Sequence, residues 1–254
     1  MSSCLSVTGV SKRFGSLSAV GGVSFEVEQG EVFGIAGPNG AGKTTLFNMI
    51  TGIPFHPDEG EVRFEGERID RLPAFQIFRR GLARTFQQEA AFDSLTVEAS
   101  VRLAGHYSGH KSSAAEVVAH NESALEITRL TEMKSRRAGD LAFFEKKRLM
   151  LATALAGRPR LLMLDEPAAG LSQDEGEALI RIVKQINAAG VTIVIIEHVL
   201  PILFGVSDRL MILDAGQVLT IDQPQTVAKD PRVVTAYLGE RRVDRKGNAN
   251  AKDR

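Results

Sequence analysis

The chain has 254 residues, 43% hydrophobic and 24% charged, so it can bury a substantial core and does not have the composition of a disordered protein. Lysine plus arginine and aspartate plus glutamate both total 31, and this zero net charge argues against a nucleic-acid-binding protein, which usually carries a basic excess. Cys4 is the single cysteine, which excludes an internal disulfide, and without a run of about 18 apolar residues any membrane crossing would fall to another chain.

The N-terminal part of the chain predicts short strands followed by a strand that is buried on both faces. Such a buried strand appears as a continuous apolar run instead of an alternating one. In chain order we expect strands at 5–10 and 23–27 with a turn at Gly21-Gly22, a buried strand at 32–36, a glycine-rich loop at 37–42, a helix at 43–51 that ends at Gly52, and a strand at 62–64 followed by a turn at 65–67.

The rest of the chain predicts a helical segment and then further buried strands that alternate with helices. This alternation is typical of an α/β fold with a mostly parallel sheet, and we expect the antiparallel pieces to lie beside that sheet. The expected elements are a helical segment at about 94–157 with helices at 112–130 and 146–156, buried strands at 161–164 and 191–196, a helix at 174–189, a hairpin with strands at 211–213 and 218–221, and a polar C-terminal tail.

The glycine-rich loop fits the phosphate-binding pattern G-x-x-x-x-G-K-[ST] and lies between a predicted strand and a predicted helix. Glycines let the backbone approach phosphates closely, and the N–H groups at the helix start face the anion. The Lys43 ammonium would contact the β- and γ-phosphates and the Thr44 hydroxyl would bind Mg²⁺. The alternative is a plain glycine turn. The predicted ATP-binding residues are Gly37, Pro38, Asn39, Gly40, Ala41, Gly42, Lys43, Thr44 and Thr45.

Two acidic residues and a histidine follow the later buried strands. Asp165 is placed to reach Mg²⁺ and Glu166 to polarise the attacking water, although an acidic pair in a turn closed by Pro167 is the simpler alternative. His198 follows the next buried strand, and ligands of open α/β sheets bind at that edge, so it can reach the γ-phosphate. An ordinary loop histidine is the alternative. The remaining histidines, His56, His106, His110 and His120, are predicted to lie on the surface.

The order of these motifs resembles the nucleotide-binding subunit of an ATP-binding-cassette (ABC) transporter, and the resemblance covers Leu5 to Gly239. It is carried by the phosphate loop, a glutamine in Arg84-Thr85-Phe86-Gln87, the acidic pair, Gly170-Leu171-Ser172 and His198. The resemblance implies a P-loop NTPase with a mostly parallel sheet, an antiparallel β subdomain and an inserted helical subdomain. It implies an ABC ATPase domain at 5–239, with the helical insert at about 94–157, and a flexible tail at 240–254.

The resemblance also assigns roles. Gln87 would sense Mg²⁺ together with Thr44 and Asp165, Glu166 would be the catalytic base, and Phe14 would stack on adenine unless it is an ordinary aromatic at a strand end. ATP and Mg²⁺ are the implied cofactors. Three stretches, 81–87, 208–213 and 230–239, are most similar to the ATPase subunits of branched-chain amino acid importers, and lipid-export ATPases share part of this similarity.

One motif departs from the family. The signature, ideally LSGGQ, corresponds here to Leu141, Ala142, Phe143, Phe144 and Glu145. In the family, two subunits hold two ATP molecules head to tail, and the signature of one chain caps the γ-phosphate bound to the other. The importer subfamily tolerates alanine and an aromatic residue at the second and third positions, so Phe144 is the anomaly. Either it obstructs the capping, or it points aside and the helix N–H groups suffice.

The resemblance implies partners, and it leaves alternatives. The partners would be a second ABC ATPase subunit, giving an asymmetric heterodimer in which the ATP bound here is hydrolysed better. They would also include polytopic permease subunits received in a groove at 87–96, and indirectly a substrate-binding protein. The chain would lie peripherally on the cytoplasmic face of the cell membrane.

The alternatives are a regulatory ATP-binding module, which the altered signature favours, and a lipid-export ATPase. A small GTPase would need an Asn-Lys-x-Asp motif, and a DNA-repair cassette would need a long coiled-coil insert; this chain has neither.

Overall fold

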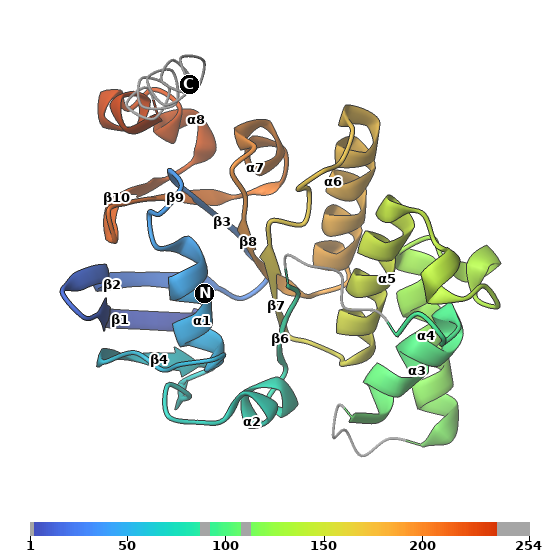
Figure 1. The fold of residues 1–254 in the computed structure, drawn as a ribbon. Helices are drawn as coiled ribbons and strands as arrows, with labels where there is room; N and C mark the ends of the chain where they lie inside the picture. Colours follow the sequence, from blue (N-terminus) through green and yellow to red (C-terminus); the bar gives the residue numbers. More distant parts are fainter. Residues whose placement is uncertain (1–2, 87–91, 108–112, 238–254) are drawn as a thin grey trace, which may run out of the picture.

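A computed structural model describes residues 3–86, 92–107 and 113–237 (Figure 1). Gln87, His110 and the predicted tail at 240–254 lie outside the described residues, as does the first half, 87–91, of the groove expected at 87–96.

A six-stranded sheet forms the centre of the molecule, in the order β10-β9-β3-β8-β7-β6. All neighbours are parallel except β10, which runs antiparallel to β9. Every residue of β3, β7 and β8 is buried, which confirms the buried strands expected from the apolar runs. The strands are β3 (Val32–Ala36), β6 (Leu82–Arg84), β7 (Leu161–Asp165), β8 (Thr192–Ile196), β9 (Arg209–Asp214) and β10 (Gln217–Asp222).

The placement of the 211–221 hairpin differs from the expectation. It was expected beside the parallel sheet, but β9 pairs in parallel with β3 and is therefore an inner strand of that sheet. The physical reason is that four consecutive residues, 210–213, are buried, so this strand needs cover on both faces.

A second, antiparallel sheet has the order β2-β1-β4-β5, with β1 (Ser3–Phe14), β2 (Leu17–Glu28), β4 (Glu59–Phe64) and β5 (Glu67–Arg68). The predicted turn at Gly21-Gly22 is wrong, because these glycines lie inside β2 and the chain reverses at Gly15-Ser16. The pair sits where the register of β1 and β2 shifts, and Gly22 has φ +70°. The Gly21 N–H also donates to the Gly216 carbonyl, which ties this sheet to the β9–β10 turn.

The two faces of the central sheet belong to two hydrophobic clusters, as the two-residue period of a strand requires. Leu162, Leu164 and Ile193 belong to the cluster shared with α5 and α6, whereas Met163 and Val194 belong to the cluster shared with α1 and the antiparallel sheet. The helices are α1 (Lys43–Thr51), α2 (Ala74–Arg79), α3 (Val97–Tyr107), α4 (Ala114–Ile127), α5 (Phe143–Ala156), α6 (Gln173–Ala188), α7 (Leu200–Val206) and α8 (Pro224–Val227), with 3₁₀ turns at Thr131–Met133 and Ala138–Asp140.

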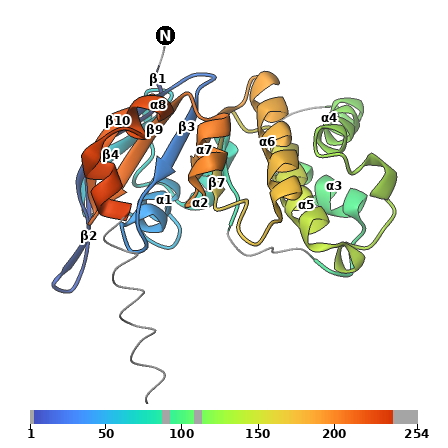
Figure 2. The same ribbon diagram turned by 90° about the horizontal axis from the view of Figure 1, so that it is seen from above.

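Helices α3, α4 and α5 pack on one another and form a group at the side of the molecule away from the antiparallel sheet, as Figures 1 and 2 both show. Two of the predicted surface histidines prove to be partly buried. The ring of His56 packs beside Gly52, and His120 Nε2 lies 2.8 Å from the Leu155 carbonyl oxygen, between α4 and α5.

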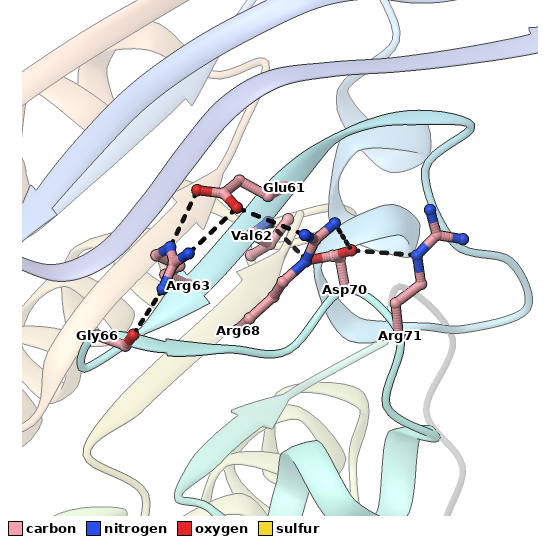
Figure 3. Close-up of polar contacts among 7 residues, drawn as sticks. All are labelled: Glu61, Val62, Arg63, Gly66, Arg68, Asp70 and Arg71. Carbon is pink, nitrogen blue, oxygen red and sulfur yellow. Dashed lines mark hydrogen bonds and ion pairs between the residues drawn. The ribbon is translucent and has the colours of Figure 1, made fainter.

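A buried carboxylate fastens the turn after β5. Asp70 is fully buried and accepts two hydrogen bonds from Arg68, at 2.9 and 3.0 Å, and one from the Val62 N–H (Figure 3). Burial disfavours the Asp70 carboxylate, but these hydrogen bonds outweigh that effect and hold the pKa of Asp70 below its usual value. The segment that leads from the antiparallel sheet to α2 is therefore fixed by charge-assisted bonds.

Candidate functional site

The loop between β3 and α1 has a backbone that glycine alone accommodates. Gly37 has φ +154° and Gly42, the residue that precedes α1, has φ +98°. A Cβ atom at Gly37 would collide with the Leu213 carbonyl oxygen, and one at Gly42 would collide with the Ala19 carbonyl oxygen. The loop thus lies against β9 and β2, and it leads into the N-terminal N–H groups of α1, which bind anions readily.

Lys43 is buried beneath this loop. Its Nζ donates hydrogen bonds to the carbonyl oxygens of Gly37, at 2.6 Å, and Pro38, at 2.9 Å. The ammonium charge is therefore held within the curve of the loop. Thr44 is exposed and Thr45 is half-buried, so a hydroxyl is presented to solvent at the first turn of the helix.

A cleft of about 610 Å³ opens beside the loop, a size typical of small-molecule sites. Its walls come from the end of β1 and the start of β2, from the loop and α1, and from the ends of β7 and β9. It brings together Glu166 and most of the predicted ATP-binding residues, whereas Gly37, Pro38, Asp165, His198 and the signature segment at 141–145 do not line it. The lining residues are Phe14, Leu17, Ser18, Ala19, Asn39, Gly40, Ala41, Gly42, Lys43, Thr44, Thr45, Glu166 and Ala215.

Phe14 stands at the end of β1, at the antiparallel-sheet side of the cleft. Its ring packs edge-on against Phe55, with ring centroids 5.2 Å apart, and it is 46% exposed. Lys12 Nζ lies 5.8 Å from the Phe14 ring centroid and forms an ion pair with Asp58 at 2.6 Å. The ring is thus supported from behind and open on the cleft side, as a surface that stacks a base requires.

The acidic pair lies where β7 ends. Asp165 is buried, and one of its oxygens, Oδ2, accepts a hydrogen bond from Arg84 at 2.7 Å. Glu166 adopts φ +46°, a conformation that non-glycine residues rarely take, and its N–H donates to the Ile196 carbonyl of β8. Because of this backbone turn, the carboxylates of Asp165 and Glu166 point in different directions. Glu166 lines the cleft, whereas Asp165 stays beneath it.

His198 follows β8 and lies beside the acidic pair. Its Nδ1 is 3.7 Å from Glu166 Oε2, which is too long for a hydrogen bond, and its side chain is 49% exposed. The structure therefore brings together His198 and Glu166 from adjacent parallel strands, at the carboxyl edge where the sequence predicts a ligand.

Glu197 is a further residue at this edge that the sequence reasoning missed. Its side chain is buried, and Oε1 accepts a hydrogen bond from the Ala168 N–H at 2.6 Å. Burial raises the pKa of Glu197 to about 7, and the nearby Glu166 carboxylate adds to that shift. A signal was available in the sequence, because Glu197 directly follows the apolar run 193–196 at the sheet edge where ligands bind.

The signature segment begins α5. Ala142 precedes the first helical residue, and its N–H donates to Glu145 Oε2 at 2.7 Å; a methyl group cannot supply the reciprocal cap. Phe144 packs against the hydrophobic core with Arg148 over its ring at 5.3 Å, so it is turned onto its own chain. Phe143 is 45% exposed and packs near Gly170, and Leu141 is buried.

The oxygen atoms at the site suit a hard cation. A hydroxyl such as that of Thr44 and a carboxylate such as that of Asp165 are ligands that Mg²⁺ prefers. Within the described residues there is no group of three or more histidine, cysteine, aspartate or glutamate side chains that could hold a metal. Phosphate oxygens and water would therefore have to complete the coordination of a magnesium ion at this site, which is its usual mode in nucleotide-binding enzymes.

A phosphate-binding loop with a buried lysine, followed by an acidic pair at the carboxyl edge of a parallel sheet, defines a P-loop nucleotide hydrolase. The sequence model of the family described as "ABC transporter" matches residues 20–169. The chain therefore belongs to the ABC transporter family, as its ATP-binding and ATP-hydrolysing subunit.

Individual relatives agree with this assignment. The chain is 37% identical to the high-affinity branched-chain amino acid transport ATP-binding protein BraF of Pseudomonas aeruginosa, over 93% of this chain and 98% of BraF. It is 32% identical to BraG of the same organism, which has the same description, over 92% of this chain and 99% of BraG. The crystal structure of an ATP-binding cassette of an ABC transporter in its ADP conformation superposes with a TM-score of 0.85 at 31% identity, covering 94% of this chain and 100% of that one.

Proposed function

We propose that this chain supplies ATP-hydrolysis energy to an importer of branched-chain or related amino acids. The observation that carries the proposal is a nucleotide-sized cleft lined by Lys43 and Glu166, with His198 beside Glu166, in a chain similar over more than nine-tenths of its length to BraF. The cassette would span 5–239, with the helical insert at about 94–157 and a tail at 240–254.

The residues at the site suggest a sequence of roles. Phe14 would stack on the base, and residues 37–45 would hold the phosphates, with the Lys43 ammonium leaving the loop carbonyls for the β- and γ-phosphates. Mg²⁺, held through Thr44, Asp165 and Gln87, would neutralise charge that develops on the phosphate oxygens. Glu166 would accept the proton of the attacking water, and His198 would donate a hydrogen bond to the γ-phosphate.

A second ATPase subunit is proposed as the partner at this site. The likeness to both BraF and BraG, two ATP-binding proteins of one organism with the same transport description, supports a pair of different chains. The segment Leu141 to Glu145 would cap the partner's ATP. Because Phe144 is packed inward, the N–H groups at the start of α5 are left to face that phosphate, while Ala142 lacks the serine hydroxyl.

Permease subunits would bind at a second cavity, which shares no lining residue with the nucleotide cleft. A cavity of about 290 Å³, lined by residues that include Phe78, Phe86 and Met150, lies between the central sheet and the helical group. In the described part of the chain, no helix has the length and apolarity needed to span a bilayer. We propose peripheral attachment through this cavity to permeases at the cytoplasmic face of the membrane, with a substrate-binding protein acting indirectly.

The test is ATPase turnover of this chain purified with its neighbouring membrane subunits and partner ATPase, in the presence of candidate substrates. Branched-chain amino acids are expected to stimulate turnover, and Glu166→Gln is expected to lower it by roughly 10² or more, since it removes the general base. The exposed Glu177 on α6 provides the matched control, because Glu177→Gln makes the same chemical change away from the cleft.

The same assay tests the asymmetry. If this chain holds the better-hydrolysed ATP, Glu166→Gln will cost more turnover than the equivalent substitution in the partner, and equal losses would contradict the asymmetric pair. Turnover that ignores every amino acid tested would count against amino-acid import. It would favour the regulatory or the lipid-export function instead.

A further inference from the structure

Arg84, on the edge strand β6, is a buried arginine that lines the cavity proposed above for the permeases and has no role so far in the nucleotide site. Its side chain is 4% exposed, and its guanidinium packs on two aromatic rings, 5.5 Å from the Phe47 centroid and 5.2 Å from the Phe86 centroid. A planar guanidinium can stack on aromatic rings in this way, whereas a lysine ammonium cannot. The two rings therefore restrict the orientations that the Arg84 guanidinium can adopt.

The hydrogen bonds of Arg84 join two parts of the site that are distant in sequence. Nη2 donates to Asp165 Oδ2 at 2.7 Å, at the end of β7. Nη1 donates to Asn48 Oδ1 at 2.7 Å and to Thr51 Oγ1 at 3.2 Å, both on α1. The helix that begins with Lys43 and Thr44 is thus tied through one guanidinium to the carboxylate at the end of β7.

Because Arg84 and Asp165 are both buried, each charge depends on the other for its stabilisation. Both side chains are about 5% exposed or less, and removing one charge of such a pair leaves the other buried without compensation. Arg84 engages the Oδ2 atom of Asp165, and so it sets the direction in which the carboxylate presents its other oxygen, Oδ1. The Thr85 side chain, directly after β6, holds the backbone of the same aspartate, since the Asp165 N–H donates to Thr85 Oγ1 at 3.4 Å.

We propose that Arg84 is a positioning residue for the magnesium side of the site: it holds Asp165 in place relative to α1 through the Arg84–Asn48 and Arg84–Asp165 bonds. This inference rests on the proposed function, in which Asp165 contributes to metal binding. It predicts that loss of the Arg84 geometry weakens binding of the metal ion and leaves binding of the nucleotide itself largely intact, since the hydrogen bonds described for Arg84 go to Asn48, Thr51 and Asp165, which are not among Phe14 and residues 37–45.

The experiment compares wild type with Arg84→Lys, which keeps the charge and loses the stacked, forked geometry. Two quantities are measured on the full chain: ADP affinity in EDTA by calorimetry, and Mn²⁺ affinity in the presence of ADP by electron paramagnetic resonance. We expect ADP affinity in EDTA to stay within about twofold and Mn²⁺ affinity to fall at least about tenfold, the usual effect of disturbing a group that orients a metal ligand.

Arg209 supplies the matched control. It is also a strand arginine stacked on a phenylalanine and paired with a glutamate, 5.3 Å from the Phe33 centroid and 3.2 Å from Glu31 Oε1, on β9. Arg209→Lys is expected to change neither affinity. Should Arg84→Lys not fold, as judged by circular dichroism, Asn48→Ala removes one anchor of Arg84, and Mn²⁺ affinity is expected to fall about threefold, within the range of an uncharged hydrogen bond.

The outcomes separate the inference from the proposed function. If wild type binds neither ADP nor Mn²⁺, the proposed function fails. If wild type binds both, two results for Arg84→Lys would overturn the inference. The first is an unchanged Mn²⁺ affinity. The second is an ADP affinity in EDTA that falls as far as the Mn²⁺ affinity does. Mn²⁺ binding weakened at constant ADP affinity supports it, because a purely structural role would not separate the two.

Discussion

Two buried aspartates, Asp70 and Asp165, each bind an arginine, and they differ in how much of the pair is buried. Asp70 is fully buried, but its partner Arg68 is 47% exposed and its carboxylate is surrounded by donors from Arg68, the Val62 N–H and Arg71. Asp165 and Arg84 are both buried, and Arg84 engages a single carboxylate oxygen. Both oxygens of Asp70 accept hydrogen bonds from Arg68 and stabilise the fold, whereas Arg84 leaves Asp165 Oδ1 available to the site.

The difference teaches how the same two residue types serve two purposes. At Asp70, water screens the charge of the half-exposed arginine, so the ion pair itself contributes little to stability. The carboxylate stabilises the turn mainly because it accepts a hydrogen bond from the buried Val62 N–H. At Asp165, the arginine has no water to replace the carboxylate and must be held by rings and by α1. The comparison therefore predicts that Asp70 variants change stability, while Arg84 variants change metal binding.

The largest stability effect is expected from Asp70→Ala. This change leaves the buried Val62 N–H without its acceptor and should lower the free energy of unfolding by about 2 kcal/mol. Urea unfolding at pH 7 followed by circular dichroism measures it, with ADP affinity in EDTA as the control that should not move. A loss below about 0.5 kcal/mol would show that the turn does not depend on this carboxylate.

A smaller, pH-dependent effect is expected at Glu197. Because its folded pKa is about 7, above the usual 4.5, the folded state holds the proton more tightly, and stability falls as pH rises through the folded value. Between pH 6 and pH 8 the wild type should lose roughly 1 kcal/mol relative to Glu197→Gln, which keeps a carbonyl acceptor for the Ala168 N–H.

Thermal unfolding of both proteins across this pH range measures the difference, and subtraction of the two curves removes the contribution of the histidines. Parallel curves would contradict a protonated Glu197. The control is the exposed Glu177→Gln, whose curve should follow that of the wild type.

The smallest effect is expected from Arg68→Lys. Because Arg68 is half-exposed, a lysine can still meet the Asp70 carboxylate with help from water, and the free energy of unfolding should fall far less than it does in Asp70→Ala. The same urea titration applies. A loss as large as that of Asp70→Ala would show that the forked geometry matters here as it does at Arg84, and the contrast between the two pairs would fail.

Much of the site follows from short patterns in the chain. The apolar run at 32–36, the loop at 37–42 and the helix at 43–51 all form where they are predicted, because a motif of fixed spacing and a buried strand are properties of neighbouring residues. The same holds for the buried strands that precede Asp165 and His198. The Gly21-Gly22 turn is the instructive failure, since glycine pairs mark turns and bulges alike.

The sequence by itself determined the ATP-binding motifs and their order, and hence the class of enzyme, since these depend on residues a few positions apart. Only the tertiary structure decided what surrounds them. It placed Arg84 against Asp165, 81 positions away, put β9 inside the parallel sheet, buried Glu197, and turned Phe144 onto its own core. Each of these depends on long-range packing, in which burial and charge pairing between distant segments select one arrangement among several that the local pattern permits.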